Sequence, residues 1–464
     1  MENQRYAKAP HLWALGVGAV VSGNFFGWQS GLVAGFDGLL IILVVVTVLY
    51  VLLAFSIAEL STTVPSGGGP YIFALHAFGP CTAFFAGLAE SLKVVITCAV
   101  VITGISSYTN QLLNLSSDCS PIWWFVFYVV FVSLNIVGVE VTFRVQAFTT
   151  VISVLILLVF YFGAATKVSC TEWVSNVDWK FPNGWDGAVK GYSFALWFYL
   201  GIEELPLAIE VTVNPERNMP IGLVTSISTL VLLAFCTVTF NSMISPGAKA
   251  LYTSTSPLLT GYESVFGGNS TTSAFSWMLI LGLIASFHSF VFCMGQLLYA
   301  IARDGYLPKI LTRLHHTRGT TYVSLIAGST IGFTVVLVLH FIIGDTRLGS
   351  VMINLALIGA LTSYTIQLIS FINLRIKEPS RQRPYRSPFG VPGAIVSILL
   401  CFAGMVSIIY SGTSNYEFLA SILVASIYFA IGAVYYFTHV RSRIEVSLTP
   451  KLHDSLLSSA SSAV

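Results

Sequence analysis

Charged residues are scarce in this 464-residue chain: Asp, Glu, Lys and Arg make up 9% of it, whereas soluble proteins contain about 25%. Hydrophobic residues make up 55%. A chain with so little charge cannot cover a water-exposed surface, and this excludes a soluble globular protein.

The common enzyme motifs are also missing. The chain has no nucleotide-binding loop, no Gly-x-Ser-x-Gly elbow and no Cys/His cluster. His315-His316 is a loop dipeptide without metal-ligand spacing. We therefore expect neither an enzyme nor a protein with a cofactor, a metal or a nucleic-acid partner.

Twelve apolar runs follow one another, each about 18–25 residues long and able to cross the ~30 Å core of a bilayer as a helix. We predict an all-α integral membrane protein: a cytosolic tail (residues 1–11), a transmembrane domain (12–440) and a Ser-rich tail (441–464). Because Met1–Pro10 is polar and the first run is too long for a signal peptide, that run is expected to remain as a membrane helix. The runs are centred on Leu12–Leu32, Leu39–Leu60, Phe84–Tyr108, Ile122–Val139, Val145–Ala165, Ala188–Val211, Ile221–Met243, Trp277–Ile301, Val323–Ile343, Ser350–Leu374, Ile395–Tyr410 and Phe418–Val440.

The positions of Lys and Arg predict the orientation. With the N-terminus in the cytosol, 16 of the 22 basic residues fall on the inside and 5 in outside loops, and Lys93 lies within a helix. This asymmetry favours two cytosolic termini. Both N-glycosylation sequons, at Asn114 and Asn269, fall in predicted outside loops and favour the plasma membrane or the secretory pathway.

Two of the seven cysteines, Cys119 and Cys170, also fall in predicted outside loops, where conditions are oxidising. Either a Cys119–Cys170 disulfide or two free thiols fits the sequence. The other five read as small apolar residues in or near helices.

A polar, glycine-rich break interrupts the first run at Ser22-Gly23-Asn24-Phe25-Phe26-Gly27. Unwinding there frees backbone groups that hydrocarbon cannot satisfy, so the break must be buried in protein or face a water-filled cavity. The sixth run holds Gly201, two adjacent carboxylates and Pro206, which predict a second interruption at Leu200–Glu204. A pair of interrupted helices indicates a ligand site, and therefore transport.

Interruptions five helices apart predict an inverted five-helix repeat. Repeat one covers about residues 12–165 and repeat two about residues 188–374. The last two helices, about residues 391–440, lack such breaks and are expected at the periphery.

The two breaks carry opposite polarity. Backbone N–H groups at Ser22, Gly23 and Asn24 suit a carboxylate or hydroxyl oxygen, and carbonyls near Tyr199–Gly201 suit an ammonium group. The alternative is that Gly23 and Gly27 only permit close helix packing. Most of the aromatic residues beside the breaks are expected to pack, and one or two to close over a ligand or contact an amine: Phe25, Phe26, Trp28, Trp197, Phe198 and Tyr199.

Acidic residues inside a membrane are costly and indicate function. They are Glu59, Glu90, Glu203, Glu204 and the borderline Glu210. Glu90 and Lys93 lie three residues apart on one helix face and are expected to pair, either as a structural ion pair or as a cation or proton site. Glu203 adjoins the second break, where it orients the unwound segment or attracts an amine, whereas Glu204 is expected to face away.

The segment Ala285–Phe290 holds three further coupling candidates. His288 is either a proton carrier or, as we favour, a hydrogen-bonded packing residue. Ser286 and Ser289 either supply oxygens to Na⁺ or bond to backbone. The coupling ion, H⁺ or Na⁺, stays open.

Three spaced motifs resemble the amino acid–polyamine–organocation permeases over nearly the full chain. They are Val64-Pro-Ser-Gly-Gly-Gly-Pro-Tyr71, Gly201-Ile-Glu203 with Asn214-Pro-Glu-Arg-Asn-Met-Pro220, and Ala302-Arg-Asp-Gly-Tyr-Leu-Pro308. The first break together with Gly87-Leu-Ala-Glu90 resembles the ethanolamine permease branch.

The resemblance implies a twelve-helix LeuT-like fold, an occluding aromatic at Tyr199 and secondary active uptake of a small amine or amino acid. The chain departs from the family at Asn24, where members often have Asp, and at Val211, where they have a second acid. Helix five lacks the Lys that replaces sodium in some relatives. A neutral Asn24 weakens the case for an amine such as ethanolamine and leaves a neutral amino acid open. A channel or a polytopic receptor is the competing interpretation.

Overall fold

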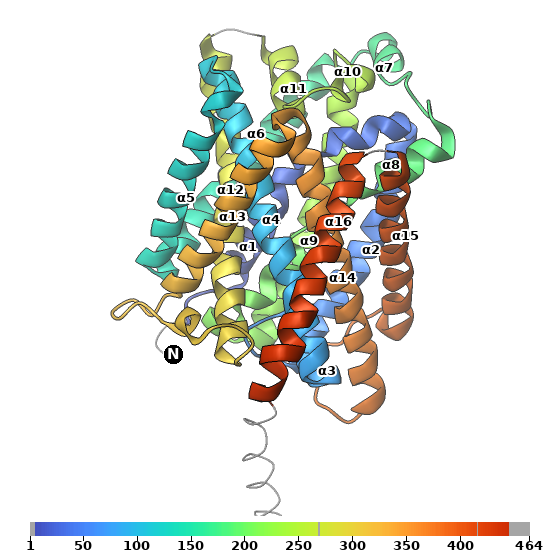
Figure 1. Cartoon of the computed structure of the whole chain (residues 1–464). Helices are drawn as coiled ribbons and strands as arrows, with labels where there is room; N and C mark the ends of the chain where they lie inside the picture. Colours follow the sequence, from blue (N-terminus) through green and yellow to red (C-terminus); the bar gives the residue numbers. More distant parts are fainter. Residues whose placement is uncertain (1–4, 268–269, 415, 445–464) are drawn as a thin grey trace, which may run out of the picture.

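The computed structural model describes residues 5–267, 270–414 and 416–444, without the side chains of residues 170–172, 270–276, 345–347, 414, 416 and 417. Its long helices run side by side and form one bundle (Figure 1). In the first half these elements are α1 (Ala9–Val20), η2 (Val21–Asn24), η3 (Trp28–Ala34), α2 (Gly35–Thr63), α3 (Pro70–Phe78), α4 (Pro80–Leu113), η4 (Ser117–Cys119), α5 (Ser120–Val137), α6 (Val139–Lys167), α7 (Cys170–Asn176), α8 (Gly184–Leu196) and η5 (Ile202–Val211). In the second half they are α9 (Pro215–Met243), α10 (Ala248–Leu251), α11 (Pro257–Phe266), α12 (Ser270–Arg303), η6 (Lys309–Thr312), α13 (Tyr322–Ile343), α14 (Asp345–Lys377), α15 (Gly390–Ser414), α16 (Tyr416–Tyr435) and η7 (Tyr436–Val440).

Ten helices in the described residues are long and apolar enough to span a membrane. The remaining two predicted runs, the first and the sixth, are the interrupted ones. Their regular parts, α1 and α8, have only 12 and 13 residues. The chain is therefore an all-helical membrane protein in which two apolar segments do not form continuous helices.

Local sequence explains where the helices start and stop. Proline occupies the first turn of α3, α4, α5, α9 and α11, where its missing N–H costs no hydrogen bond. Gly79 and Gly344 adopt φ of 88° and 74° where one helix ends and the next begins, a conformation that suits glycine.

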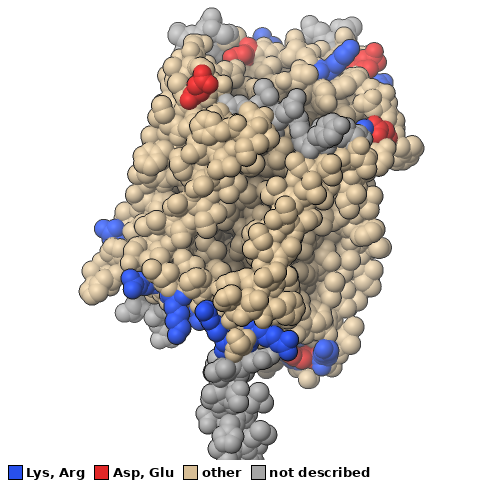
Figure 2. Space-filling view, viewed as in Figure 1, with Lys and Arg blue, Asp and Glu red and all other residues tan. Residues whose placement is uncertain are grey.

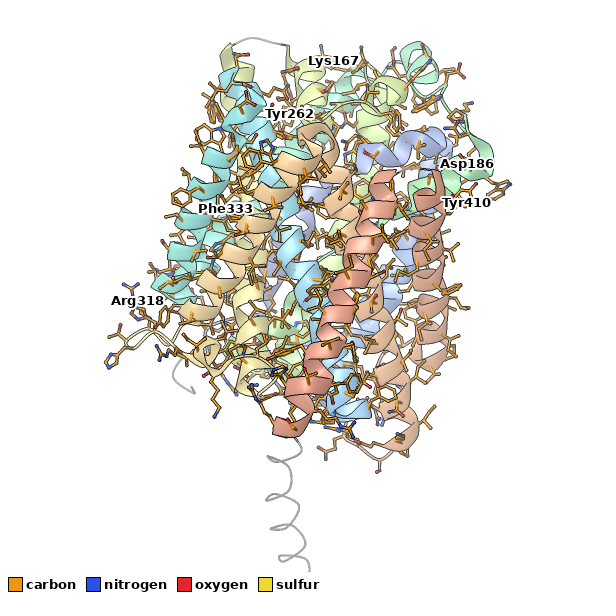
Figure 3. The ribbon with its side chains drawn as sticks, in the orientation of Figure 1. Lys167, Asp186, Tyr262, Arg318, Phe333 and Tyr410 are labelled. Carbon is orange, nitrogen blue, oxygen red and sulfur yellow. The ribbon has the colours of Figure 1, made fainter. Side chains whose placement is uncertain are left out.

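Charge divides the bundle into two ends and an apolar middle. One end, here called the basic end, carries the N-terminal segment, α3 and the loops of residues 304–321 and 378–389, and Lys and Arg gather along it (Figures 1 and 2). The opposite end carries α7, α10 and α11. In Figure 3, Lys167 and Asp186 lie near the opposite end, Arg318 lies at the basic end and Phe333 lies between them.

The middle of the bundle exposes large apolar side chains, as a lipid-facing surface requires. Phe162 on α6 is 73% exposed and Phe402 on α15 is 67% exposed. Polar side chains are buried instead, among them Lys93, Glu90, Glu203 and Glu204. The bundle therefore buries a group of ionisable side chains behind an apolar flank.

The second interruption begins earlier than the sequence predicted. The α8 helix ends at Leu196, residues 197–201 form a turn, and a 3₁₀ helix begins at Ile202. Gly201, with φ of 117°, ends this turn rather than starting it. Glu203 and Glu204 consequently lie on η5 and not inside the break.

Candidate functional site

The two interruptions lie against each other. A Cβ atom on Gly23 would approach the carbonyl oxygen of Trp197 to 2.7 Å and Cα of Phe198 to 3.1 Å. These are backbone atoms and cannot move aside as a side chain does. Glycine is therefore required at position 23 for the first break to reach the second.

Neutral side chains satisfy the first break. Ser286 on α12 accepts a hydrogen bond from the Ser22 N–H (3.0 Å) and donates one to the Gly18 carbonyl (2.7 Å). Thr237 on α9 donates to Asn24 Oδ1 (2.8 Å), and the Tyr108 hydroxyl donates to the Phe25 carbonyl (2.7 Å). Three different helices thus hold this break without any ionised group.

Charged side chains satisfy the second break. Glu203 Oε2 accepts a hydrogen bond from the Gly201 N–H (3.1 Å). Its other oxygen accepts from Lys93 Nζ (2.7 Å) and from the Tyr364 hydroxyl (2.5 Å). Glu203 therefore bonds to the end of the unwound segment, and both of its oxygens accept from protein donors.

Lys93 joins three carboxylates. Its Nζ lies 2.7 Å from Glu90 Oε1, 2.7 Å from Glu203 Oε1 and 2.8 Å from Glu204 Oε1. Ser363 also donates to Glu90, at 2.6 Å. Glu204 faces this cluster, so the expectation that it points away is wrong. The reason is that Lys93 on α4 approaches between the neighbouring side chains of η5 and reaches both.

A chain of hydroxyls connects the charged cluster to the start of the break. Tyr364 lies 3.4 Å from Tyr50, hydroxyl to hydroxyl, and Tyr50 donates to the Leu196 carbonyl at 3.2 Å. Tyr199, which the family resemblance assigns as an occluding aromatic, instead points toward α2, where its hydroxyl lies 2.7 Å from Thr47 Oγ1. Its ring packs on Tyr50.

A cavity of about 500 Å³ opens above the first break, toward the opposite end of the bundle. Phe26 lines it, and the Trp197 indole contacts the Phe26 ring and donates to the Phe26 carbonyl at 3.0 Å. Of Trp197 and Tyr199, Trp197 is thus the one whose side chain contacts the first break. Hydroxyl and amide groups supply most of the polar lining, and none of the described lining residues is charged: Gln29, Thr103, Ser106, Asn110, Tyr252 and Ser254 are representative.

The remaining coupling candidates separate into two groups. Ser289 donates to the Leu15 carbonyl at 3.4 Å, so it holds helix α1 as Ser286 does. His288 points instead toward α5 and α6, between Asn135 (3.1 Å) and the Thr142 carbonyl (3.1 Å). Within the described residues, no group of three or more His, Cys, Asp or Glu side chains is arranged to hold a metal ion.

Two modification predictions stay open. Asn114 is exposed at the end of α4, where a glycan could attach, and Asn269 lies outside the described residues. Cys119 is half-buried, but the side chain of Cys170 lies outside the described part of the chain.

Ion pairs join separate elements at the basic end. Arg303 on α12 contacts Glu210 on η5 at 2.6 Å. Glu59 on α2 accepts from Arg375 Nε (2.8 Å) and from the Ser387 N–H (2.7 Å). Tyr71 donates to Asp304, and burial together with this hydrogen bond raises the pKa of Tyr71.

Sequence reasoning missed the neutral partners of both breaks. Thr237, Tyr108, Tyr50 and Tyr364 lie in apolar runs and carry no charge that would single them out. The sequence offers only a weak indication of their roles, namely that each carries a hydroxyl group on a helix with few polar residues. Their roles depend on contacts with segments far away in the sequence.

Comparison with known proteins supplies the family. The model of a family described as "Amino acid permease" matches residues 12–436. The chain belongs to this amino acid permease family. It is therefore a multi-pass membrane transporter of amino acids or related solutes, and not an enzyme.

The relatives cover nearly the whole chain at low identity. An uncharacterized transporter of Rhizobium meliloti is 26% identical, with 90% of each chain covered. The methylthioribose transporter of Bacillus subtilis is 25% identical and a branched-chain amino acid permease of the same organism is 23% identical. These alignments cover 94% of this chain, and 94% and 93% of the two relatives respectively.

Proposed function

We propose that this permease is a secondary active transporter that imports a small amino acid without net charge by alternating access, driven by an ion gradient. The observation that carries the proposal is the contact between the two breaks at Gly23 and Trp197. A helix that only anchors a protein has no use for an unwound segment at mid-membrane.

The helix contacts support an inverted repeat within a twelve-helix, LeuT-like bundle. In this proposal α1 to α6 and α8 to α14 form the two repeats, and α15 and α16 are peripheral. The packing of α4 along α14 then corresponds to that of α12 along α6. Likewise, the packing of α9 on α1 corresponds to that of α2 on α8. Such paired contacts are what a pseudo-two-fold axis through the breaks produces.

The proposed ligand site uses backbone polarity. N–H groups near Gly23 and Asn24 face a carboxylate, and carbonyls from Trp197 to Tyr199 face an ammonium group. The side chains of Asn24 and Glu203 already accept hydrogen bonds from other protein side chains, Thr237 and Lys93 respectively. The ligand therefore meets mainly backbone groups. A zwitterion fits this arrangement because its own two charges match the two polarities.

The uncharged cavity favours a substrate without net charge. A cation such as ethanolamine would gain no ionic partner from the described lining residues, so we place a neutral amino acid ahead of it. The names of two relatives, for methylthioribose and branched-chain amino acids, also refer to solutes without net charge.

We further propose a plasma-membrane location with both termini in the cytosol. The basic end then faces the cytosol, in accord with its Lys and Arg residues. The 500 Å³ cavity faces outward, and the Arg303–Glu210 and Glu59–Arg375 pairs close the inner side. This arrangement corresponds to a state that accepts substrate from outside.

Counterflow in proteoliposomes tests the proposal. Purified protein is reconstituted with unlabelled alanine, serine, leucine or methionine inside, and entry of the labelled amino acid is followed, with ethanolamine, lysine and glutamate in parallel. We expect saturable counterflow for at least one neutral amino acid and less for the charged solutes. A channel would give flux without saturation, a receptor would give none, and either result would refute the transporter.

A further inference from the structure

The buried cluster around Lys93 contains more negative charge than positive charge. Glu90, Glu203 and Glu204 all lie within 2.8 Å of one ammonium group, and all four side chains are at most 1% exposed. Fully ionised, this cluster would carry two net negative charges. Removing such a charge from water is costly, and repulsion between neighbouring carboxylates adds to the cost.

Hydrogen bonds distinguish the three carboxylates. Glu203 accepts from Lys93, Tyr364 and the Gly201 N–H. Glu90 accepts from Lys93 and Ser363. Donors of this kind favour the ionised form of a carboxylate, and both residues have more than one of them.

Glu204 has fewer donors. Its Oε1 lies 2.8 Å from Lys93, which Glu90 and Glu203 share, and besides Lys93 no described residue donates a hydrogen bond to either oxygen of Glu204. The groups near Glu204 are Lys93, Glu90 and Cys98 on α4, Glu203 on η5 and Cys293 on α12. The Tyr364 and Tyr50 hydroxyls of α14 and α2 face Glu203 instead.

From this geometry we infer that Glu204 is the proton-carrying group of the transport cycle. The inference rests on the proposed function, since it names the coupling ion and its site. An O–H bond forms between one Glu204 oxygen and a proton from hydronium on the outer side, and it breaks when that proton passes to water on the cytosolic side. No electron is transferred, and Lys93 keeps its contacts with Glu90 and Glu203.

The contacts also connect the proton to the substrate. When Glu204 is ionised, it competes with Glu203 and Glu90 for Lys93. When Glu204 is protonated, Lys93 pairs fully with Glu203, whose other oxygen holds Gly201 in the second break. Proton and substrate therefore bind cooperatively, and substrate affinity falls as the pH rises through the titration of Glu204. We expect a change of roughly tenfold, within the usual range of such coupling.

The test compares counterflow with proton-driven uptake in proteoliposomes that contain the wild type or Glu204→Gln. The probes are labelled alanine, serine, leucine and methionine, each tested singly, and a pH-sensitive dye inside the vesicles records proton entry. The wild type should show counterflow, accumulation driven by an inward proton gradient, and acidification on substrate addition. Glu204→Gln should keep counterflow within about threefold and lose both proton-dependent signals. Glu140→Gln, an exposed carboxylate on α6 that pairs with Arg144 of the same helix, should keep both signals and is the control.

The outcomes separate the two proposals. Absence of wild-type counterflow for every probe refutes the transport function, and the inference with it. Counterflow in the wild type with proton-driven accumulation retained in Glu204→Gln overturns the inference alone. Loss of counterflow by folded Glu204→Gln, judged by size-exclusion chromatography, also overturns it, because a group that only carries the proton is not needed for exchange. If Glu204→Gln does not fold, Glu204→Asp replaces it: a shifted pH dependence of counterflow supports the inference, and an unchanged one contradicts it.

Discussion

Both breaks leave backbone groups of an unwound helix to be hydrogen-bonded inside the bundle, and the two use different chemistry. Ser286, Thr237 and Tyr108 satisfy the first with neutral hydrogen bonds. Glu203, backed by Lys93, satisfies the second. Hydrogen bonds between neutral groups keep the same geometry over a wide pH range. The contacts of a cluster of ionisable groups change when one of its members gains or loses a proton. We infer that the first break positions the substrate and that the second also senses the driving ion.

The largest expected effect comes from removing the contact between the breaks. Gly23→Leu should abolish uptake, and even Gly23→Ala should reduce it strongly, because a Cβ atom there collides with the Trp197 carbonyl. Gly412→Ala is the matched control, since its Cβ would come close only to the flexible tip of Ile422 (2.9 Å) and would meet the Leu419 backbone at ordinary contact distances of 3.6 and 3.7 Å. Uptake is measured in cells together with surface labelling. Wild-type transport by Gly23→Ala would show that the first break is not part of the substrate site.

Neutralising the anchor of the second break should have the next largest effect. Glu203→Gln places an amide where Lys93, Tyr364 and the Gly201 N–H need an acceptor. Breaking a buried ion pair by changing one partner typically costs about 3–5 kcal/mol. Both the melting temperature in detergent and the maximal uptake rate should fall. Wild-type kinetics in this variant would contradict the role of Glu203 as the anchor.

A smaller effect is expected for the neutral partner of the first break. Ser286→Ala leaves the Ser22 N–H and the Gly18 carbonyl without this hydroxyl, at a cost of about 1–3 kcal/mol for a buried group left unsatisfied. Uptake should fall while its pH profile keeps the shape of the wild type. Ser426→Ala, which removes an exposed hydroxyl bonded to its own helix, is the control. A shifted pH profile in Ser286→Ala would contradict the claim that only the second break responds to protons.

The smallest effect on coupling should come from His288→Gln. His288 bonds to Asn135 and to the Thr142 carbonyl, away from both breaks. The variant should melt at a lower temperature but accumulate substrate in response to a proton gradient as the wild type does. Loss of that response in the folded variant would identify His288 as a proton carrier.

The sequence predicts much of this architecture because hydropathy, glycine and proline act locally. The apolar runs locate the helices, Ser22–Gly27 and Gly201 locate the interruptions, and the spacing of Glu90 and Lys93 indicates their pairing. The direction of Glu204 was mispredicted because it depends on Lys93, 111 positions earlier in the chain. Hydropathy also gives no weight to single hydroxyls such as Thr237, whose partner Asn24 is 213 residues away.

The central claim is that the two touching breaks together bind the substrate. The most direct measurement is an experimental structure of the wild type with a neutral amino acid selected by counterflow. We predict its carboxylate within hydrogen-bond distance of the N–H groups near Gly23 and Asn24, and its ammonium group at the carbonyls of Trp197 to Tyr199. A transported amino acid bound only in the outer cavity above Phe26, with Gly23 still packed on Trp197, would contradict the account.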